Sequence, residues 1–433
     1  MTSLLGRISQ GRATQGRISQ GRTTLGRVTQ RGSIQEPGAL DRISAATADL
    51  EPVFAAVDST ALDANAAALV RRANGLPVRV ASKSVRSRAV LERVLGSDLT
   101  AREGFRGIMT YSPAEAIWLA GLGAQDILMG YPSVDRESLA TITRDRVLSG
   151  RITLMVDAAE HLDVIRAAAG SDHLKPRICI DVDASLRLGP LHLGVRRSPL
   201  REPAEVAGFA RTAKSRGFRV VGVMFYEAQI AGLPDSNPIV ELVKRASASE
   251  LAGRRRAVVE AVTDVTGKLE IVNSGGTGSL EVSSADPVVT EVTAGSGLFA
   301  PTLFDGYTAF TATPSLYFAL PVVRKPTPQI ATAFGGGYIA SGPASTSRTP
   351  SPVAFSDALG GLVRGGLKLL RNEGAGEVQT PVAGTGIAIG DRIWFRHAKA
   401  GEICERVDAL HLVEPDGTVA AVPTYRGEAK NFG

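Results

Sequence analysis

A regular alternation of short apolar runs and helix-like stretches begins at residue 78 and most constrains how this chain can fold. Eight runs rich in Val, Ile and Leu read as buried strands, at residues 78–83, 107–111, 126–130, 152–156, 177–182, 220–226, 269–272 and 291–294. Helix-like stretches separate them, as expected for parallel strands joined by crossover helices. Eight such units within about 220 residues favour a closed barrel over an open sheet. The sequence therefore predicts an α/β fold built on a (β/α)8 TIM-type barrel.

The segments on either side of this alternation predict different structures. Residues 39–77 contain a lead-in helix, an apolar strand at 53–58 and a second helix, whereas residues 78–304 hold the barrel. From 305 to 433 the apolar runs are short and glycine-punctuated, with one helix expected at about 356–371. We therefore predict a mostly β C-terminal domain at 305–433, whose sheet the strand at 53–58 could join.

The first 38 residues form a tail of a different composition. A five-residue repeat starts with Gly6-Arg7-Ile8-Ser9-Gln10, and six arginines precede the first acidic residue, Glu36. A period of five suits neither helix nor strand, so we expect residues 1–38 to be disordered or to reflect an over-long start of the reading frame. No aromatic residue is interleaved to stack on a base, and the rest of the chain is almost neutral, so no nucleic-acid partner is expected.

The composition excludes some classes of protein. No apolar run approaches the roughly 18 residues of a membrane-spanning helix, so no membrane partner is expected. The first residues lack a secretory apolar core, and two cysteines, Cys179 and Cys404, make no disulfide framework. These features predict a cytoplasmic protein in a reducing compartment.

Lys83 follows the apolar run Val78–Ala81 and ends the first predicted barrel strand. In parallel α/β folds the chemistry gathers at the carboxyl ends of the strands. A lysine on an apolar wall there can have its pKa lowered and act as an amine nucleophile. The spacing alone leaves open the alternative that Lys83 is an ordinary solvated lysine on a loop.

Two glycine-rich turns follow the last two predicted barrel strands. The first contains Ser274, Gly275, Gly276 and Thr277, and the second contains Gly295 and Ser296. Such turns let backbone N–H groups close on an anion, and the late strands of these barrels often hold phosphate. Barrel closure would place both turns beside the first strand and Lys83. Two tight surface turns are the alternative that the residues leave open.

A lysine beside two glycine turns that can bind a phosphate suggests pyridoxal phosphate (PLP). Lys83 would be bonded to the cofactor, and the glycine turns would surround its phosphate. The ring nitrogen of the cofactor then needs a partner, and the candidates are Arg187 and Arg196, which follow the fifth strand. Tyr226 ends the sixth strand and could stack on the ring or act as a general acid. A surface position is the alternative for both arginines.

The order of these motifs along the chain resembles that of a known family. The motifs are Arg79-Val-Ala-Ser-Lys83, Asp181-Val-Asp183 with Arg187, Tyr226-Glu227, Ser274-Gly-Gly-Thr277 and Thr290-Glu291-Val292. Over about residues 45–430 the chain resembles the fold-type III PLP enzymes, the alanine racemase-like barrel group. Within that group it resembles the D-threonine aldolase and D-serine dehydratase-like branch, often described as amino acid deaminase/aldolase. The resemblance implies a small β domain after the barrel, Lys83 as the Schiff-base lysine, PLP as cofactor, a small-molecule amino acid substrate and a homodimer.

The resemblance also bears on metal binding. Members of this branch that use a divalent metal bind it through a C-terminal histidine and a Cys or Asp two residues further on. Here His397 is followed by Ala398 and Lys399, and Cys404 lies further along the chain. His397 and Cys404 are thus the candidate metal ligands, but a lysine in the second ligand position argues against a metal.

The resemblance implies that the protein is a PLP-dependent lyase. It would act on a D-amino acid with a β-hydroxyl, by aldol cleavage or dehydrative deamination, through an external aldimine. Lys83 would be the base, and Tyr226 is the second catalytic candidate. A racemase on the same fold is one alternative, but it needs a second base on the opposite face that the sequence does not identify. A non-catalytic PLP-binding protein is another, although single-barrel relatives of that kind lack a C-terminal β domain.

Overall fold

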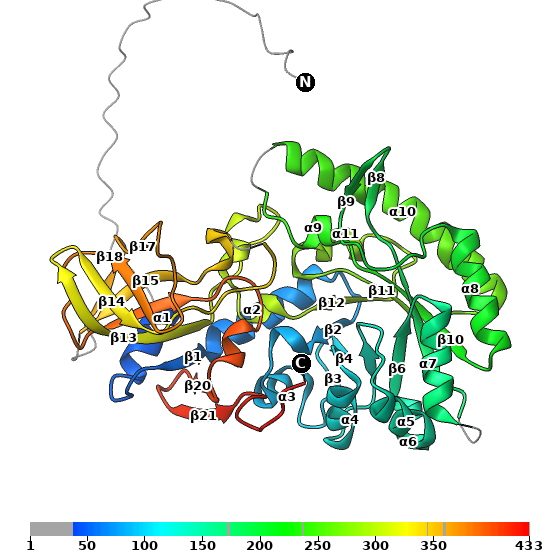
Figure 1. Ribbon diagram of the computed structural model, residues 1–433, viewed down its shortest axis with the longest axis horizontal. Coiled ribbons are helices and arrows are strands. Elements are labelled where there is room, and N and C mark those ends of the chain that lie inside the picture. The colour runs from blue at the N-terminus through cyan, green and yellow to red at the C-terminus, as the bar shows by residue number, and fades with distance from the viewer. Residues whose placement is uncertain (1–37, 171–173, 236–237, 344, 358–360, 433) are drawn as a thin grey trace, which may run out of the picture. The chain divides into compact units, whose positions relative to one another are not determined.

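The computed structural model describes residues 38–170, 174–235, 238–343, 345–357 and 361–432 (Figure 1). Apart from Gly38, the predicted tail at residues 1–38 lies outside the described residues. Among the helices of the described part, none is both long enough and apolar enough to cross a membrane.

Eight parallel strands close into a barrel, which confirms the predicted fold. Their bounds are β2 (Val78–Ala81), β4 (Phe105–Thr110), β5 (Ile127–Met129), β6 (Ile152–Val156), β7 (Arg177–Val182), β10 (Arg219–Phe225), β11 (Ile271–Ser274) and β12 (Glu291–Ala294). The ring closes where β12 pairs in parallel with β2, with Val292 opposite Val78 and Ala294 opposite Val80. A short β3 (Ala101–Arg102) pairs antiparallel with β4. The apolar runs form this barrel because strands covered on both faces need nearly continuous apolar side chains.

Helices or short helical turns separate consecutive barrel strands, as the alternation predicts. The helices in this part of the fold are α3 (Arg88–Leu95), α4 (Pro113–Gly121), α5 (Arg136–Arg144), α6 (Arg146–Arg151), α7 (Ala159–Ala169), α8 (Pro203–Ser215), α9 (Ala228–Ala231), α10 (Pro238–Thr266) and α11 (Leu280–Ser284). At the start of α4, Ser112 Oγ accepts a hydrogen bond from the Glu115 amide. Asp135 caps α5 in the same way by accepting from the Ser138 amide. These caps set where each helix begins and therefore how long the preceding loop is.

The inside of the barrel combines an apolar cluster with a buried ion-pair network. The apolar cluster consists of Leu128, Met155, Cys179, Val221, Met224 and Ile271. Arg79 on β2 is 1% exposed, and its Nη2 lies 2.6 Å from Glu291 Oε2 on β12. Its Nη1 lies 2.9 Å from Asp126 Oδ1, just before β5. Asn273 Nδ2 on β11 also donates to Glu291 Oε1 at 2.7 Å, so the network joins β2, β11, β12 and the residue before β5.

The second part of the fold is a mostly β domain, as predicted, and β1 (Phe54–Asp58) belongs to its sheet. β1 runs antiparallel to β13 (Leu316–Thr327) and parallel to β20 (Ala409–Val413). The remaining strands are β14 (Ile330–Phe334), β15 (Ser351–Ser356), β16 (Leu362–Arg364), β17 (Lys368–Leu369), β18 (Gln379–Ala383), β19 (Arg392–Arg396) and β21 (Val419–Pro423). The helices α1 (Ala39–Ala46) and α2 (Ser59–Arg72) flank β1 in sequence. The strand that the barrel count leaves over is therefore used in the second domain.

The helix expected at about 356–371 is wrong, because the described part of this stretch forms strands. β15 pairs with β16 and β19, and β17 pairs with β18. Gly365 and Gly366, between β16 and β17, have φ angles of +83° and +72°, which a right-handed helix does not contain. The spacing of apolar residues suggests a helix here, but the glycine pair and the strand pairing override it.

The C-terminal segment returns to the barrel at a buried carboxyl group, that of Glu115 on α4. Tyr425 Oη donates to Glu115 Oε1 at 3.0 Å, and the Tyr111 amide donates to Oε2 at 2.8 Å. Trp118 on the same helix packs against Tyr425, with ring centroids 5.0 Å apart. Burial raises the pKa of Glu115 to about 7, because the charged carboxylate is deprived of water.

This raised pKa predicts a pH-dependent free energy of unfolding. The unfolded chain loses the Glu115 proton near 4.5 and the folded chain near 7, so the stabilisation is complete below pH 4.5 and is lost as the pH rises through 7. A shift of this size corresponds to roughly 3 kcal/mol. Glu115→Gln imitates the protonated carboxyl, so denaturant titrations should show it gaining on the wild type between about pH 5 and about pH 8. An identical difference in free energy at the two pH values would contradict the assignment.

Candidate active site

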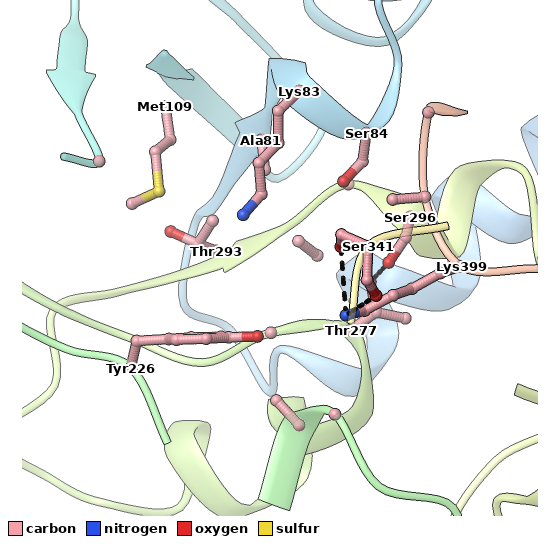
Figure 2. A pocket seen from close by; sticks show the side chains of 18 of the residues that line it. Ala81, Lys83, Ser84, Met109, Tyr226, Thr277, Thr293, Ser296, Ser341 and Lys399 are labelled. Carbon is pink, nitrogen blue, oxygen red and sulfur yellow. Dashed lines mark hydrogen bonds between the residues drawn. The ribbon is translucent and has the colours of Figure 1, made fainter. Parts of the chain in front are cut away.

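A cavity of about 630 Å³ opens at the carboxyl ends of the barrel strands, where the β domain approaches them (Figure 2). The barrel residues that line it include Lys83, Tyr131, Arg197, Tyr226, Thr277 and Ser296, and the β domain adds Ser341, Lys399 and Glu402. This is the end of the barrel at which chemistry is expected. The two parts of the fold thus both contribute side chains to one site.

Lys83 lies in a short turn, Ser82–Ser84, directly after β2, and its side chain points into the cavity (Figure 2). Its Nζ donates a hydrogen bond to Tyr131 Oη and lies 5.1 Å from the centre of that ring. Ser82 Oγ donates to the Met109 carbonyl at 3.0 Å and so holds the turn against β4. The lysine found from the sequence is therefore presented to the cavity by a turn that is bonded to the neighbouring strand.

Two residues that the sequence analysis missed, Tyr131 and Arg197, complete the wall around Lys83. The Arg197 guanidinium lies 5.4 Å from the centre of the Tyr131 ring and 5.0 Å from that of Tyr226. Burial raises the pKa of Tyr131, but the charge of Lys83 and its hydrogen bond outweigh burial, so the pKa lies below its usual value. Tyr131 follows β5 closely, so its position at a strand end was a usable signal. Nothing in the sequence distinguishes Arg197 from Arg196.

Arg187 and Arg196, the predicted partners of the ring nitrogen, do not line this cavity. They line a separate hollow beside the hairpin of β8 (Leu186–Leu188) and β9 (Leu191–Leu193). Arg187 Nη2 lies 2.5 Å from Asp183 Oδ2, and the Arg187 side chain is 45% exposed. Asp183 holds the Arg187 guanidinium at the hairpin, and Arg196 lines the same hollow, so neither arginine lines the cavity that contains Lys83.

The two glycine-rich turns meet in the cavity. Its lining includes Gly275, Gly276, Thr277, Gly295 and Ser296. Thr277 Oγ1 accepts from the Gly297 amide at 3.0 Å and from Ser296 Oγ at 3.4 Å, so the turns contact each other. A Cβ atom on Gly295 would lie 2.5 Å from the Ala81 carbonyl oxygen, so glycine is required for this turn to pack against the end of β2. Barrel closure therefore makes the turns neighbours of the Lys83 strand.

Ser274 lies behind the first glycine turn and does not line the cavity. Its Oγ donates to Glu227 Oε2 at 3.0 Å and accepts from Arg255 Nη2 at 2.9 Å. The same carboxylate accepts from Ser279 Oγ at 2.8 Å and from the Gly275 amide at 3.3 Å. Ser274 and Glu227 thus hold the shape of the turn from the side away from the cavity.

Tyr226 follows β10 and lies across the cavity from Lys83 (Figure 2). A Cβ atom on Gly276 would lie 3.5 Å from Tyr226 Cε2, so the ring packs against the glycine turn. The Arg197 guanidinium also lies 5.0 Å from the centre of the ring. The ring therefore forms a flat wall that could support a planar ligand by stacking.

His397 and Cys404, the candidate metal ligands, are buried in the β domain. Neither ring nitrogen of His397 has a hydrogen-bond partner among the described residues, and the ring packs edge-on against Phe299. Burial lowers the pKa of His397 to about 4 and raises the pKa of the Cys404 thiol. Across the described ranges, no three His, Cys, Asp or Glu side chains gather in a way that could hold a metal. These donors do not fit a divalent metal.

The groups around the cavity do fit PLP. They combine a primary amine at Lys83, hydroxyls at Thr277 and Ser296, the backbone of two glycine turns and the aromatic wall of Tyr226. A volume of about 630 Å³ is in the range of small-molecule sites, which is roughly 300–1,000 Å³. This cofactor needs an amine that bonds its aldehyde and a set of hydrogen-bond donors that binds its phosphate.

Comparison with known proteins points to one family. The sequence matches the family model described as alanine racemase, N-terminal domain, over residues 57–301. Among curated proteins, D-threonine aldolase from Arthrobacter sp is 27% identical over 233 residues, which are 52% of this chain and 56% of that protein. The chain therefore matches little more than half the length of this relative.

Two solved structures share the fold over most of both chains. D-threonine aldolase from Filomicrobium marinum superimposes with a TM-score of 0.69 at 18% sequence identity. The superposition covers 88% of this chain and 96% of the aldolase chain. D-threo-3-hydroxyaspartate dehydratase from Delftia sp. HT23 has a TM-score of 0.65 at 20% identity, with 87% and 98% covered. Because the family model matches more than half of the chain, the protein belongs to the alanine racemase N-terminal domain family of fold-type III PLP enzymes, as its motifs indicated.

Proposed function

We propose that this protein is a PLP-dependent lyase that acts on D-amino acids with a β-hydroxyl group. The observation that carries the proposal is the single cavity that Lys83 lines together with the turns at 275–277 and 295–296. The amine can bond the aldehyde of the cofactor, and the two glycine turns can bind its phosphate. The similarity to proteins named D-threonine aldolase and D-threo-3-hydroxyaspartate dehydratase supports lyase chemistry on D-amino acids.

Five residues of the cavity would hold the cofactor. Lys83 Nζ would bond its aldehyde carbon, and the hydroxyls of Thr277 and Ser296, with the N–H groups of their turns, would bind its phosphate. Tyr226 would support the ring, and Arg197 is the cavity cation that could face the ring nitrogen. When bound, PLP supplies an electron sink for the negative charge that develops as a bond to the substrate Cα breaks.

Lys83 is also the group that would move protons at the substrate. Its hydrogen bond to Tyr131 Oη restricts the direction in which the amine points. Arg197, beside the Tyr131 and Tyr226 rings, adds positive charge to this wall and so favours a bound anion there. Aldol cleavage removes a proton from the β-hydroxyl, whereas dehydrative deamination delivers one to it. The two reactions therefore differ in the direction of proton transfer at that oxygen.

The proposal is tested by assaying the full chain after it has been loaded with PLP. D-threonine should give glycine and acetaldehyde if the protein is an aldolase, or 2-oxobutanoate and ammonia if it is a dehydratase. D-serine should give pyruvate and ammonia in the second case. The L-enantiomers are the controls. Light scattering on the same sample tests the homodimer that the resemblance implies.

Other results would favour the alternatives. Interconversion of D- and L-amino acids without cleavage would indicate a racemase. Tight PLP binding without turnover of any of these amino acids would indicate a non-catalytic PLP-binding protein. A chain that does not bind PLP at all would overturn the proposal.

A further inference from the structure

The β domain contributes an ammonium group, that of Lys399, to the wall of the cavity. The carboxylate of Glu402, which belongs to the same loop as Lys399, binds the backbone amides of that loop. Glu402 Oε1 accepts from the amides of Ala398 at 2.9 Å and Lys399 at 2.8 Å, and Oε2 accepts from the Ala400 amide at 2.7 Å. A Cβ atom on Gly401 would lie 2.7 Å from the Lys83 carbonyl oxygen, so this loop packs directly on the lysine turn. The backbone of Lys399 is therefore well positioned relative to Lys83.

The side chain of Lys399 reaches only neutral oxygen atoms. Its Nζ donates to the Ser341 carbonyl at 3.2 Å and lies 3.5 Å from Ser341 Oγ. Figure 2 shows this amine in the part of the view that also holds Thr277 and Ser296, away from Lys83. Within the described residues no carboxylate comes within ion-pair distance of it. A half-buried ammonium that bonds only neutral oxygen atoms keeps its positive charge available to an anionic ligand in the cavity.

The charges around the cavity lead to the same conclusion. Of its two lining carboxylates, Glu405 pairs with Arg86 at 2.6 Å, and Glu402 is occupied by three backbone amides. Lys83, Arg197 and Lys399 all line the cavity. The cavity is therefore strongly electropositive and suited to a ligand with more than one negative group.

We propose that the Lys399 ammonium binds an oxyanion of the ligand inside the cavity, so that the β domain supplies a charged anchor to a site built on the barrel. The proposal rests on the proposed function for the source of that oxyanion, which is either the phosphate of the cofactor or a carboxylate of the amino acid. The turns that carry Thr277 and Ser296 offer a phosphate only uncharged donors, so an ammonium would neutralise part of its charge. A substrate carboxylate has the same requirement.

The test uses Lys399→Met, which removes the charge at similar length, Lys399→Arg, which keeps it, and Lys368→Met as the matched control. Lys368 is exposed on β17 of the same domain and does not line the cavity. Dissociation constants for PLP and for pyridoxal, which lacks the phosphate, are measured by fluorescence quenching. KM and kcat for D-threonine are measured on the loaded proteins, and thermal unfolding checks that each variant is folded.

The two sources give different results. If Lys399 binds the phosphate, Lys399→Met should weaken PLP binding roughly 10- to 100-fold and leave pyridoxal binding unchanged. If it binds a substrate carboxylate, PLP binding should stay the same and KM for D-threonine should rise by a similar factor at unchanged kcat. In both cases Lys399→Arg should recover much of the loss. Lys399→Met that matches Lys368→Met in all of these measurements would overturn the proposal.

A failure of the proposed function is distinguishable from a failure of this inference. If the wild type does not bind PLP, the proposed function fails, and inorganic phosphate then becomes the probe. Calorimetry should show phosphate binding to the wild type and to Lys368→Met, and its loss in Lys399→Met. Equal phosphate binding by wild type and Lys399→Met, or none by either, would overturn the role of Lys399.

Discussion

Lys83→Ala should lose the covalent attachment of PLP and reduce lyase activity by roughly 10³-fold or more. The reason is that one amine has two tasks, to hold the aldehyde carbon of the cofactor and to move the proton at the substrate. Tyr131, the hydrogen-bond partner of Lys83 Nζ, carries a phenol and not an amine, so it cannot take over the bond to the aldehyde carbon. The measurement is borohydride reduction of the loaded protein, followed by peptide mass mapping and by the D-threonine assay.

The matched control for this experiment is Lys175→Ala, because Lys175 is an exposed lysine that precedes β7 and does not line the cavity. It should keep the cofactor adduct and the activity of the wild type. The mapping also separates the two lysines of the cavity. A reduced adduct on Lys399 with none on Lys83 would contradict the assignment of Lys83 as the residue that bonds PLP. It would also contradict the proposed arrangement of the cofactor.

Arg79→Met should lower the free energy of unfolding by about 3–5 kcal/mol. Arg79 is 1% exposed and pairs through two nitrogens with Glu291, which is itself 7% exposed. Removing the guanidinium leaves a carboxylate buried inside the barrel, with Asn273 as a remaining hydrogen-bond donor. The loss is large because the desolvation of Glu291 is no longer offset by an opposite charge.

The measurement is denaturant unfolding of the wild type, Arg79→Met and Arg79→Met/Glu291→Met. The double variant should recover a large part of the loss, because replacing both charges with apolar groups removes the unpaired carboxylate. Arg106→Met is the matched control, since Arg106 pairs with Asp126 at 3.2 Å but is 66% exposed. It should cost less than about 1 kcal/mol. Equal losses for Arg79→Met and Arg106→Met would contradict the role assigned to burial.

Much of the fold was predictable because it depends on local repetition. The eight predicted barrel strands each overlap a strand of the structure, since strands covered on both faces carry apolar runs that stand out from the amphipathic helices between them. The helix prediction for residues 356–371 was wrong because the conformation there does not depend on local repetition. There the spacing of apolar residues suggests a helix, but the pairing of β16 with β15 and of β17 with β18 decides the conformation.

The sequence predicted those site residues that lie at the carboxyl end of a barrel strand, because that position alone brings a side chain to the mouth of the barrel. Lys83, Tyr226 and the glycine turns all stand at strand ends, and the structure places them around one cavity. The choice among Arg187, Arg196 and Arg197 could not be made in this way. They lie in and after a hairpin whose geometry depends on cross-strand pairing and on the Asp183 carboxylate.

By itself the sequence determined the barrel, the β domain after it and the position of Lys83 at the end of the first strand, because these follow from the period of apolar residues and from strand direction. The tertiary structure decided which side chains share the cavity with that lysine. Tyr131, Arg197 and Lys399 are distant from Lys83 in the sequence and line the same cavity only when the ring closes and the β-domain loop packs on the turn at 82–84. Such contacts depend on side-chain directions and long-range packing, for which a linear pattern carries no signal.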